Sequence, residues 1–345
     1  MNGSPRLNLE NLNNNCLCVN GQQIHPGLAP AISSFGLRPD AIESHRRLGL
    51  AHWITDTRNP LFARVMTNRV WHYHFGIGLV ETPNDLGFHA GLPSHPELLE
   101  WLSGEFGMTH RHQTLAPDGA NRVEVNRFSI KRLHRLLVNS ATYRQSSTFD
   151  SAAAKIDTNN RLLWRMNPRR LEAEAVRDAM LAVAGELNTE LGGKGYSDVN
   201  SYFFKGTQFY DPIDPVGYAN HRRTLYRMGA RGGRSPFLDT FDCPDPSTTT
   251  PRRSATVTPL QALSLLNHSF SLRMADHFAN RLIRETPQSS EATASDDQIR
   301  RAFRLLCSRL PVEEEVDLSR EFISRRGLPA FCRAMWSSSE FVFVD

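Results

Sequence analysis

Three segments of the chain begin with a polar residue followed by proline and then carry apolar residues at helical spacing. They start at Asn59-Pro60, His95-Pro96 and Thr258-Pro259. Proline suits the first turn of a helix because its missing N–H would have no partner within the helix, and the residue before it can cap that end. Residues 44–54 and 170–187 have the same apolar period without a proline. These patterns predict a mainly α fold, an irregular multi-helix globular domain with long loops and at most a few short strands.

The remaining segments lack this period. Residues 1–43 are rich in Asn, Gly and Pro and are predicted to be a disordered or linker leader, so the helical domain is expected over 44–345. An acidic, Ser-rich linker is expected within it at 284–295, between a long helix from 258 to 283 and three shorter helices. Residues 107–127 are polar and irregular, which predicts a surface insertion, and the polar stretches 145–160 and 188–220 predict loops. A short strand is predicted at 222–228.

Composition excludes several classes of protein. Of the 345 residues, 40% are hydrophobic and 22% charged, which is ordinary for a globular chain. The net charge of +4 comes from arginines scattered along the chain, with no zinc-finger spacing, so we expect no nucleic-acid partner. No segment is long and apolar enough to cross a bilayer, and the first residues contain no apolar core of a secretory signal. The five cysteines form neither a disulfide framework nor a haem-c attachment motif.

One candidate site is the segment from Phe241 to Asp245 with the arginines that follow it. Asp242 and Asp245 are three residues apart on a proline-containing loop and can hold a hard cation or act as an acid/base pair. Arg252 and Arg253 can bind an anionic ligand in a bidentate manner. The alternative is an Asp–Arg network that ties a long loop to the core.

A second candidate contains His95, Asp85 and Glu97, with His89 between them in sequence. A histidine can serve as an acid/base group, and histidines with a carboxylate can bind a metal. The alternative is a helix start, with Ser94 or His95 as the cap and Glu97 favourable in the first turn.

Two helices supply further polar candidates. Glu174 and Asp178 are four residues apart on one helical face, which permits a carboxylate pair, but Glu174 and Arg177 also have the spacing of an ordinary ion pair. Gln261 and Asn267, in the helix that begins at Pro259, are candidate ligand-binding residues; alternatively they are buried polar groups that bond neighbouring loops. The sequence contains no H-E-x-x-H, G-x-S-x-G or phosphate-binding glycine motif.

Several motifs in fixed order resemble the PSD-one family, a cytochrome-associated domain of planctomycetes. The matching segments are NRVWHYHFGIGLVETPNDLG at 68–87, PSHPELLEWL at 93–102, LHRLLVNSATYRQSS at 133–147, RLEAEAVRDAM at 170–180, FDCPD at 241–245, RRS at 252–254, TPLQALSLLN at 258–267 and EFVFVD at 340–345. Arg144, in the third of these, is a further ligand-binding candidate. The resemblance implies a domain of unknown function that ends a large exported protein.

That resemblance sets the expectations for function. It implies haem-c-like and second uncharacterised modules as partners, and an exported, periplasmic or cell-surface location, whereas the chain alone leaves the location open. We expect a ligand-binding or scaffolding module in polysaccharide handling. One alternative is a hydrolase or lyase that acts on an anionic polysaccharide through Asp242 and Asp245; another is an accessory module of a cytochrome-containing electron-transfer protein. No cofactor is evident, a divalent cation is possible, and whether the chain is an enzyme stays open.

Overall fold

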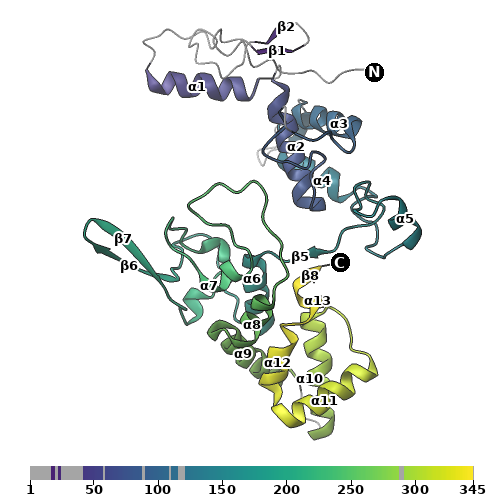
Figure 1. Cartoon of the computed structure of the whole chain (residues 1–345), viewed down its shortest axis with the longest axis vertical. Helices are drawn as coiled ribbons and strands as arrows, with labels where there is room; N and C mark the ends of the chain where they lie inside the picture. Colours follow the sequence, from purple (N-terminus) through teal and green to yellow (C-terminus); the bar gives the residue numbers. More distant parts are fainter. Residues whose placement is uncertain are drawn as a thin grey trace. The chain divides into compact units, whose positions relative to one another are not determined.

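The structure of this protein is a computed structural model (Figure 1). It describes residues 17–19, 22–24, 42–56, 59–87, 90–108, 110–115, 121–286 and 291–344, with the backbone alone for 17–19, 22–24, 110–115, 121–126 and 291–295. Within these ranges the chain forms thirteen α-helices, and its strands pair only as two-stranded antiparallel ladders. The predicted mainly α fold is therefore confirmed.

The chain divides into two compact units, residues 1–167 and 168–345, where the sequence suggested one domain from residue 44. The first unit contains helices and two hairpins; these are α1 (Glu43–Ile54), α2 (Pro60–Phe75), α3 (Pro96–Gly107), α4 (Ile130–Val138), α5 (Ser151–Ile156), β1 (Leu17–Val19), β2 (Gln22–Ile24), β3 (His110–Leu115) and β4 (Asn121–Asn126). Its core lies among α2, α3 and α4 and includes Trp71, Phe75, Leu102 and Leu137. Apart from β1, β2, Ile42 and Glu43, the predicted leader lies outside the described residues, and Glu43 already belongs to α1.

Helix α2 follows the capping signals of its sequence. The side chain of Asn59 accepts a hydrogen bond from the Leu61 N–H at 3.0 Å, and Pro60 occupies the first turn. The helix ends at Gly76, whose φ of 84° lies in the left-handed region that glycine adopts without a steric penalty.

The segment after α2 is held by one buried side chain. Asn68 is fully buried; its Nδ2 donates to the Val80 carbonyl at 2.9 Å and its Oδ1 accepts from the Val80 N–H at 2.9 Å. A Cβ atom on Gly78 would lie 2.4 Å from that carbonyl oxygen, so only glycine fits. The hydrogen bonds between Asn68 and Val80, and the close approach of Gly78 to the Val80 carbonyl, give a structural reason for both residues in the first family-like motif.

Two loop predictions in the first unit were wrong. Residues 107–127 contain the hairpin of β3 and β4, and residues 145–160 contain α5. The strand sequences HRHQTL and NRVEVN are polar at many positions, so the apolar alternation of a half-buried strand is weak. Helix α5 has only six residues and is capped by Asp150, whose side chain accepts a hydrogen bond from the Ala152 N–H at 2.8 Å.

The second unit contains most of the helices. Its elements are β5 (Arg169–Arg170), α6 (Ala173–Ala184), β6 (Val199–Phe204), β7 (Thr207–Pro212), η3 (Tyr218–Asn220), η4 (Thr224–Tyr226), α7 (Pro236–Thr240), α8 (Pro259–Asn267), α9 (Ser269–Glu285), α10 (Glu291–Leu306), α11 (Glu313–Arg326), α12 (Leu328–Met335), α13 (Ser339–Val342) and β8 (Phe343–Val344). Helices α6, α9 and α12 surround a core that includes Met180, Phe278 and Trp336. The apolar tail of the chain joins this core, because Phe341 and Val342 are buried and β8 pairs with β5.

Four element predictions in this unit were wrong. The long helix from 258 to 283 breaks at His268, which caps the end of α8 and the start of α9. Residues 222–228 form a 3₁₀ turn with isolated bridges rather than a strand. Residues 188–220 contain the hairpin of β6 and β7. Helix α10 begins at Glu291, inside the expected linker 284–295, of which 287–290 lie outside the described residues.

A search of the described helices for one long and apolar enough to span a membrane found none.

Candidate functional site

The oxygens of Asp242 bind neighbouring protein groups. They accept hydrogen bonds from the Thr256 N–H at 2.8 Å, from the Thr256 hydroxyl at 2.9 Å and from Gln261 Nε2 at 3.4 Å. Arg170, whose side chain is 8% exposed, lies 3.8 Å from the same carboxylate and also donates to the Thr256 carbonyl. Asp242 has a φ of 64°, so the backbone turns sharply at this point. These contacts connect the loop to β5 and α8.

Asp245 takes part in a separate set of contacts at the surface. It accepts hydrogen bonds from the N–H and hydroxyl of Ser247 at 2.8 and 2.6 Å, and from Arg234 Nη1 at 2.8 Å. The hydrogen bonds from Ser247 lower the pKa of Asp245, and the charge of Arg234 adds to this effect. The two carboxylates of the predicted pair therefore bind different partners.

The arginines of the same motif have different environments. Arg253 forms a bidentate pair with Glu174 of α6, with Nη2 to Oε1 at 3.0 Å, and lies 3.3 Å from Glu172. Burial alone would raise the pKa of Glu174, but the hydrogen bonds from Arg253 outweigh it and the pKa is lowered. Arg252 is exposed. Arg253 thus neutralises carboxylates of a helix rather than those of its own loop.

The two amides of α8 also differ. Gln261 is 2% exposed and closes a capping box, since its Oε1 accepts from the Thr258 N–H at 3.0 Å while its Nε2 lies 3.3 Å from the Thr256 hydroxyl. Asn267 is the exposed last residue of the helix.

The candidates of the first unit lie on turns and helix ends. His95 occupies the cap position of α3 without capping it through its side chain, and its Nδ1 lies 2.9 Å from the Ser94 hydroxyl. Asp85 accepts from the Gly87 N–H at 2.8 Å and closes a turn. Glu97 is exposed in the first turn of α3, and Arg144 is exposed after α4. His89 lies outside the described residues.

A search for three or more His, Cys, Asp and Glu side chains placed to hold a metal found no such group among the described residues.

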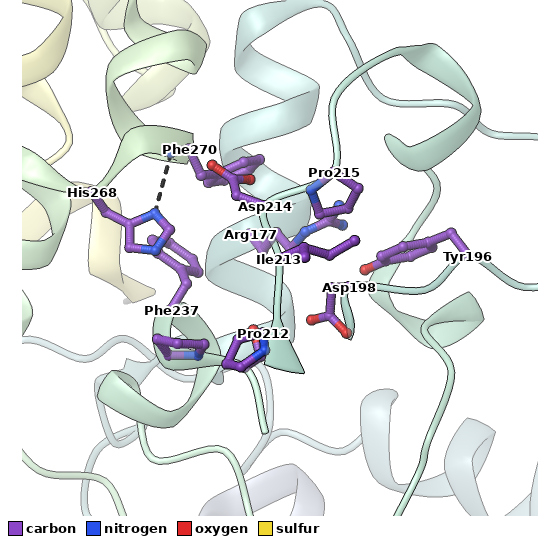
Figure 2. A pocket seen from close by; sticks show the side chains of 12 residues that line it. Arg177, Tyr196, Asp198, Pro212, Ile213, Asp214, Pro215, Phe237, His268 and Phe270 are labelled. Atoms are coloured by element: carbon purple, nitrogen blue, oxygen red, sulfur yellow. Dashed lines mark hydrogen bonds between the residues drawn. The ribbon is translucent and has the colours of Figure 1, made fainter. Parts of the chain in front are cut away.

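A cavity of about 180 Å³ opens in the second unit, at the base of the hairpin of β6 and β7. Figure 2 shows Tyr196 and Asp198 on one side of it and His268 on the other. The full lining is Arg177, Tyr196, Asp198, Pro212, Ile213, Asp214, Pro215, Ser235, Pro236, Phe237, His268 and Phe270.

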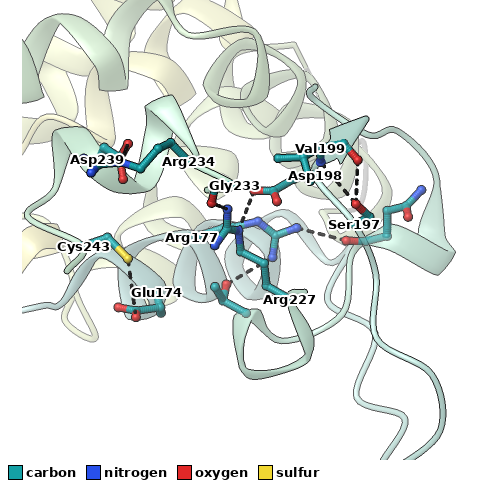
Figure 3. A network of polar contacts seen from close by, with 12 residues as sticks. Glu174, Arg177, Ser197, Asp198, Val199, Arg227, Gly233, Arg234, Asp239 and Cys243 are labelled. Carbon is teal, nitrogen blue, oxygen red and sulfur yellow. Dashed lines mark hydrogen bonds and ion pairs between the residues drawn. The ribbon is translucent and has the colours of Figure 1, made fainter. Parts of the chain in front are cut away.

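Two buried oxygens of these residues form no hydrogen bond of ordinary geometry with the described residues, although the Thr224 hydroxyl is close enough to the Tyr196 phenol to act on its pKa. They are the hydroxyl of Tyr196 and Oδ1 of Asp198, in side chains of residues that are 6% and 8% exposed. The other oxygen of Asp198 accepts from Arg227 Nε at 2.7 Å, and Arg227 also donates to the Gly233 carbonyl (Figure 3). Burial raises the pKa of the Tyr196 phenol, so the hydroxyl keeps its proton and can donate it. Two residues of the cavity wall therefore each contain a buried oxygen without an ordinary hydrogen bond, one a carboxylate acceptor and the other a hydroxyl donor.

Arg177 of α6 joins this wall through the face of its guanidinium. The group lies 4.8 Å from the centre of the Tyr196 ring and 5.4 Å from that of Phe270. Its terminal nitrogens donate to the carbonyls of Arg222 and Asn220, both at 3.0 Å. The predicted ion pair between Glu174 and Arg177 is wrong, because Glu174 pairs with Arg253 instead. Arg177 binds backbone carbonyls of the segment that contains η3 and η4.

The opposite wall contains a neutral histidine and an ion pair. His268 Nδ1 accepts the Phe270 N–H at 3.2 Å, which places the proton of the neutral ring on Nε2. Burial lowers the pKa of His268, and the charge of Arg273 acts in the same direction. Asp214 forms a bidentate pair with Arg273, with Nη2 to Oδ1 at 2.6 Å, and accepts from the Ser269 hydroxyl.

The comparisons with known proteins identify a family but no activity. The family model PSD1, described as a protein of unknown function (DUF1553), matches residues 46–323. The chain belongs to the PSD1 family. This confirms the family that the motifs predicted. Searches of curated proteins and of solved structures returned no match.

Tyr196 is held in the PSD1 chain by a close backbone contact. Its N–H donates to the Tyr226 carbonyl at 3.0 Å, and its own carbonyl accepts from the Met228 N–H at 2.8 Å. A Cβ atom on Gly195 would lie 2.4 Å from the Tyr226 carbonyl oxygen, so the glycine allows the two segments to approach. The position of the hydroxyl thus depends on residues thirty places away in sequence.

Sequence reasoning missed this cavity because it assigned 188–220 to a loop. One signal was present in α6, where Arg177 lies within the apolar stripe formed by Ala173, Val176, Met180 and Leu181. A charged residue on the buried face of a helix is uncommon without bound partners. It marked a buried polar region, although it did not indicate which distant segments complete it.

Proposed function

We propose that the second unit of this PSD1 chain binds a neutral, hydroxyl-rich ligand, such as one sugar residue, in the cavity beside Tyr196 and Asp198. The observation that supports this is the pair of buried oxygens without an ordinary hydrogen bond to the described residues. A buried polar group left unsatisfied costs about 1–3 kcal/mol. A ligand hydroxyl that donates to Asp198 Oδ1, and another that accepts from Tyr196, would recover much of this cost.

The charges of the wall favour a neutral ligand over an anionic one. Asp198 lines the cavity and carries a carboxylate, whose charge repels anions. The terminal nitrogens of Arg177 already donate to backbone carbonyls, and Arg227 is committed to Asp198. Neither guanidinium offers the open fork of N–H groups that binds a carboxylate or sulfate.

The size and walls of the cavity suit a small ring. Its volume of about 180 Å³ is below the range of roughly 300–1,000 Å³ for drug-sized ligands and corresponds to about six water molecules. Pro212, Pro236 and Phe237 supply apolar surface opposite the polar groups. A sugar ring likewise has both apolar and polar surface, with C–H groups on its faces and hydroxyls at its edge.

This proposal makes specific the ligand-binding role in polysaccharide handling that the family resemblance suggested. The contacts of Asp242 and Asp245 favour a structural role for these carboxylates, so they do not support the hydrolase or lyase alternative. Export, a cell-surface location, a divalent cation and haem-containing partners stay predictions.

The test is a comparison of two tyrosine variants. Binding of glucose, galactose, xylose and N-acetylglucosamine is measured by calorimetry and thermal unfolding, where ligand at about 100 times its dissociation constant stabilises by about 2.7 kcal/mol. Tyr196→Phe removes one hydrogen bond to the ligand, which contributes roughly 1 kcal/mol, so it should weaken binding about 5–10-fold. The variant should be as stable as the parent.

The matched control is Tyr226→Phe. The Tyr226 hydroxyl accepts from the Gly192 N–H at 2.8 Å and is outside the cavity lining, so this variant should lose stability and keep its sugar affinity. The proposal fails if none of these sugars binds the parent protein, or if the two variants bind equally well.

A further inference from the structure

The hairpin of β6 and β7 rises directly from the proposed binding cavity. Asp198, in the wall, immediately precedes β6, and Pro212, also in the wall, is the last residue of β7. The two strands project away from the helices of their unit (Figure 1). A ligand that fills the cavity and extends outward therefore meets this hairpin first.

One face of the hairpin carries three exposed aromatic rings. Tyr202 is opposite Phe209 in the strand register, and Phe204 is two residues further on the same face. These residues are 47%, 42% and 56% exposed. The rings of Tyr202 and Phe209 lie 5.5 Å apart at 15° and form a stacked pair, while Phe204 lies 6.5 Å from Phe209. We call Tyr202, Phe204 and Phe209 the aromatic face.

The three rings of the aromatic face are exposed and do not belong to the core of the unit. On the other side of the hairpin Tyr210 contacts the chain near Gly232, where an added Cβ would lie 3.1 Å from the Tyr210 ring. The rings of the aromatic face contact one another, and Lys205 Nζ lies 5.3 Å from the centre of the Phe204 ring. A two-stranded hairpin is marginally stable in water, and contiguous exposed apolar surface marks an interaction site.

We propose that the aromatic face binds the continuation of a carbohydrate chain, one residue of which occupies the cavity. The natural ligand is then an oligosaccharide or polysaccharide rather than a free sugar. This inference rests on the proposed function. It follows from the continuity of the hairpin with the cavity, because Asp198 and Pro212 belong to both.

The composition of the hairpin favours a neutral sugar chain as the occupant. Its strands and turn carry one cation, Lys205, and one anion, Asp211, so they offer no charge complementarity to an anionic lipid surface or a charged peptide. Aromatic rings present flat faces to the C–H groups of a sugar ring while the hydroxyls at its edge stay in water.

The experiment measures affinity against the length of the ligand. Linear oligomers of about two to six residues, built from the sugar that binds the cavity, are titrated into the full chain by calorimetry. In the parent, affinity should rise about tenfold or more from the single sugar to the longer oligomers, as expected for one or more aromatic contacts. The Tyr202→Ser/Phe204→Ser/Phe209→Ser variant should bind the single sugar as the parent does and lose the gain with length.

Two further variants keep the result interpretable. Phe203→Ser removes a ring that is 71% exposed on the opposite face of the same strand and should keep the full gain with length. Phe204→Ser alone leaves the stacked Tyr202–Phe209 pair in place and should lose part of the gain. Unchanged binding of the single sugar reports that the base of the hairpin is folded in each variant.

The possible outcomes separate the two proposals. If no sugar binds the parent, the proposed function fails and this inference falls with it. If a single sugar binds through Tyr196 but longer oligomers bind no better, or if Phe203→Ser removes the gain as fully as the triple variant, only this inference is overturned. Vesicles of neutral phosphatidylcholine that bind the parent and not the triple variant, with no gain from oligomer length, would assign the aromatic face to a membrane surface instead.

Discussion

Two regions of the second unit each place an aspartate beside an arginine, but the two carboxylates differ in the hydrogen bonds that they accept. In the loop after α7, the carboxylate of Asp242 receives hydrogen bonds from Thr256 and Gln261 and lies beside Arg170. In the cavity wall, Asp198 receives one charged hydrogen bond from Arg227 through Oδ2, while Oδ1 has no partner among the described residues. The loop carboxylate has its donors within the protein, whereas one oxygen of the cavity carboxylate has no donor among the described residues.

This difference shows that residue type and spacing are weak guides to a binding site in this chain. Both aspartates precede or lie within segments rich in turn-forming residues, and the loop is the more conspicuous in sequence because of its neighbouring carboxylate and arginines. What separates them is the supply of donors from other segments. A buried polar atom without a partner is rare enough to require an explanation, and ligand binding is one.

The largest expected effect comes from breaking the ion pair in the cavity wall. Asp198 and Arg227 have side chains that are 11% and 12% exposed, so Arg227→Met leaves a buried charge without its partner. We expect a loss of about 3–5 kcal/mol in the free energy of unfolding, measured in urea, together with loss of sugar binding. A loss below about 1 kcal/mol would mean that water already solvates Asp198 and that the wall is less enclosed than its burial indicates.

A smaller loss is expected in the loop. Asp242→Ala removes the acceptor for the Thr256 N–H and hydroxyl and leaves Arg170 beside no carboxylate. Stability should fall by about 2–3 kcal/mol, whereas sugar affinity of the folded protein should stay unchanged. Asp242→Asn is the milder control, because asparagine keeps one acceptor and tolerates the φ of 64° at this position. Loss of affinity without loss of stability would instead make this loop part of the site.

The pair between Arg253 and Glu174 should contribute less again. Their side chains are 34% and 30% exposed, so solvent screens the interaction. Arg253→Met should lower the free energy of unfolding by about 1 kcal/mol, and the difference from the parent should shrink in about 1 M salt, where the screening length falls to roughly 3 Å. An effect that is independent of salt would indicate that packing of the arginine stem, rather than charge, holds the loop.

Mild acid should have the smallest effect, and His268 contributes to it from the cavity side, while His221, whose pKa burial also lowers, contributes from outside the cavity lining. Because burial lowers the pKa of His268 below its ordinary 6.5, the unfolded chain takes up a proton at a higher pH than the folded protein. This contribution to stability is therefore complete above about pH 6.5 and decreases as the pH falls from there towards the lowered folded-state pKa. Asp214 opposes the shift and Arg273 supports it.

Substitution of His268 isolates this effect from other titrating groups. His268→Asn retains a side chain that caps helices well and removes the titration, so the slope of stability against pH below 6.5 should become shallower. Urea unfolding of the parent and the variant at several pH values between about 5 and 7.5 measures it. Equal slopes in the two proteins would assign the pH dependence to other histidines.

Much of the helical fold could be predicted from local signals. The start of α2 at Asn59-Pro60, its end at Gly76 and the start of α8 at Thr258-Pro259 all follow from capping residues within a few positions of the boundary. The hairpin of β6 and β7 could not be found in this way. Its strands are exposed on both faces along most of their length, so no apolar alternation marks them.

The candidate site was less accessible to sequence reasoning. The sequence pointed to the loop at Asp242 because carboxylates and arginines are close together there in sequence, but in the structure Asp245 pairs with Arg234 and Arg253 with Glu174. The sequence suggested Arg177 only as an ion-pair partner of Glu174. The cavity combines Tyr196 and Asp198 at the start of the hairpin with Phe237 of α7 and His268 between α8 and α9. No local pattern connects these segments, which are up to about seventy residues apart.

The sequence by itself determined that this protein is mainly helical, where several helices begin and end, and that it belongs to the PSD1 family. These properties depend on apolar period, capping and motifs, which act over a few residues. Only the tertiary structure decided which aspartate is satisfied and which is open, because the donors to Asp242 and Asp198 come from residues 14 and 29 positions away. The proposed ligand binding depends on which oxygens stay without partners after those distant hydrogen bonds have formed, so it would be a property of the folded chain.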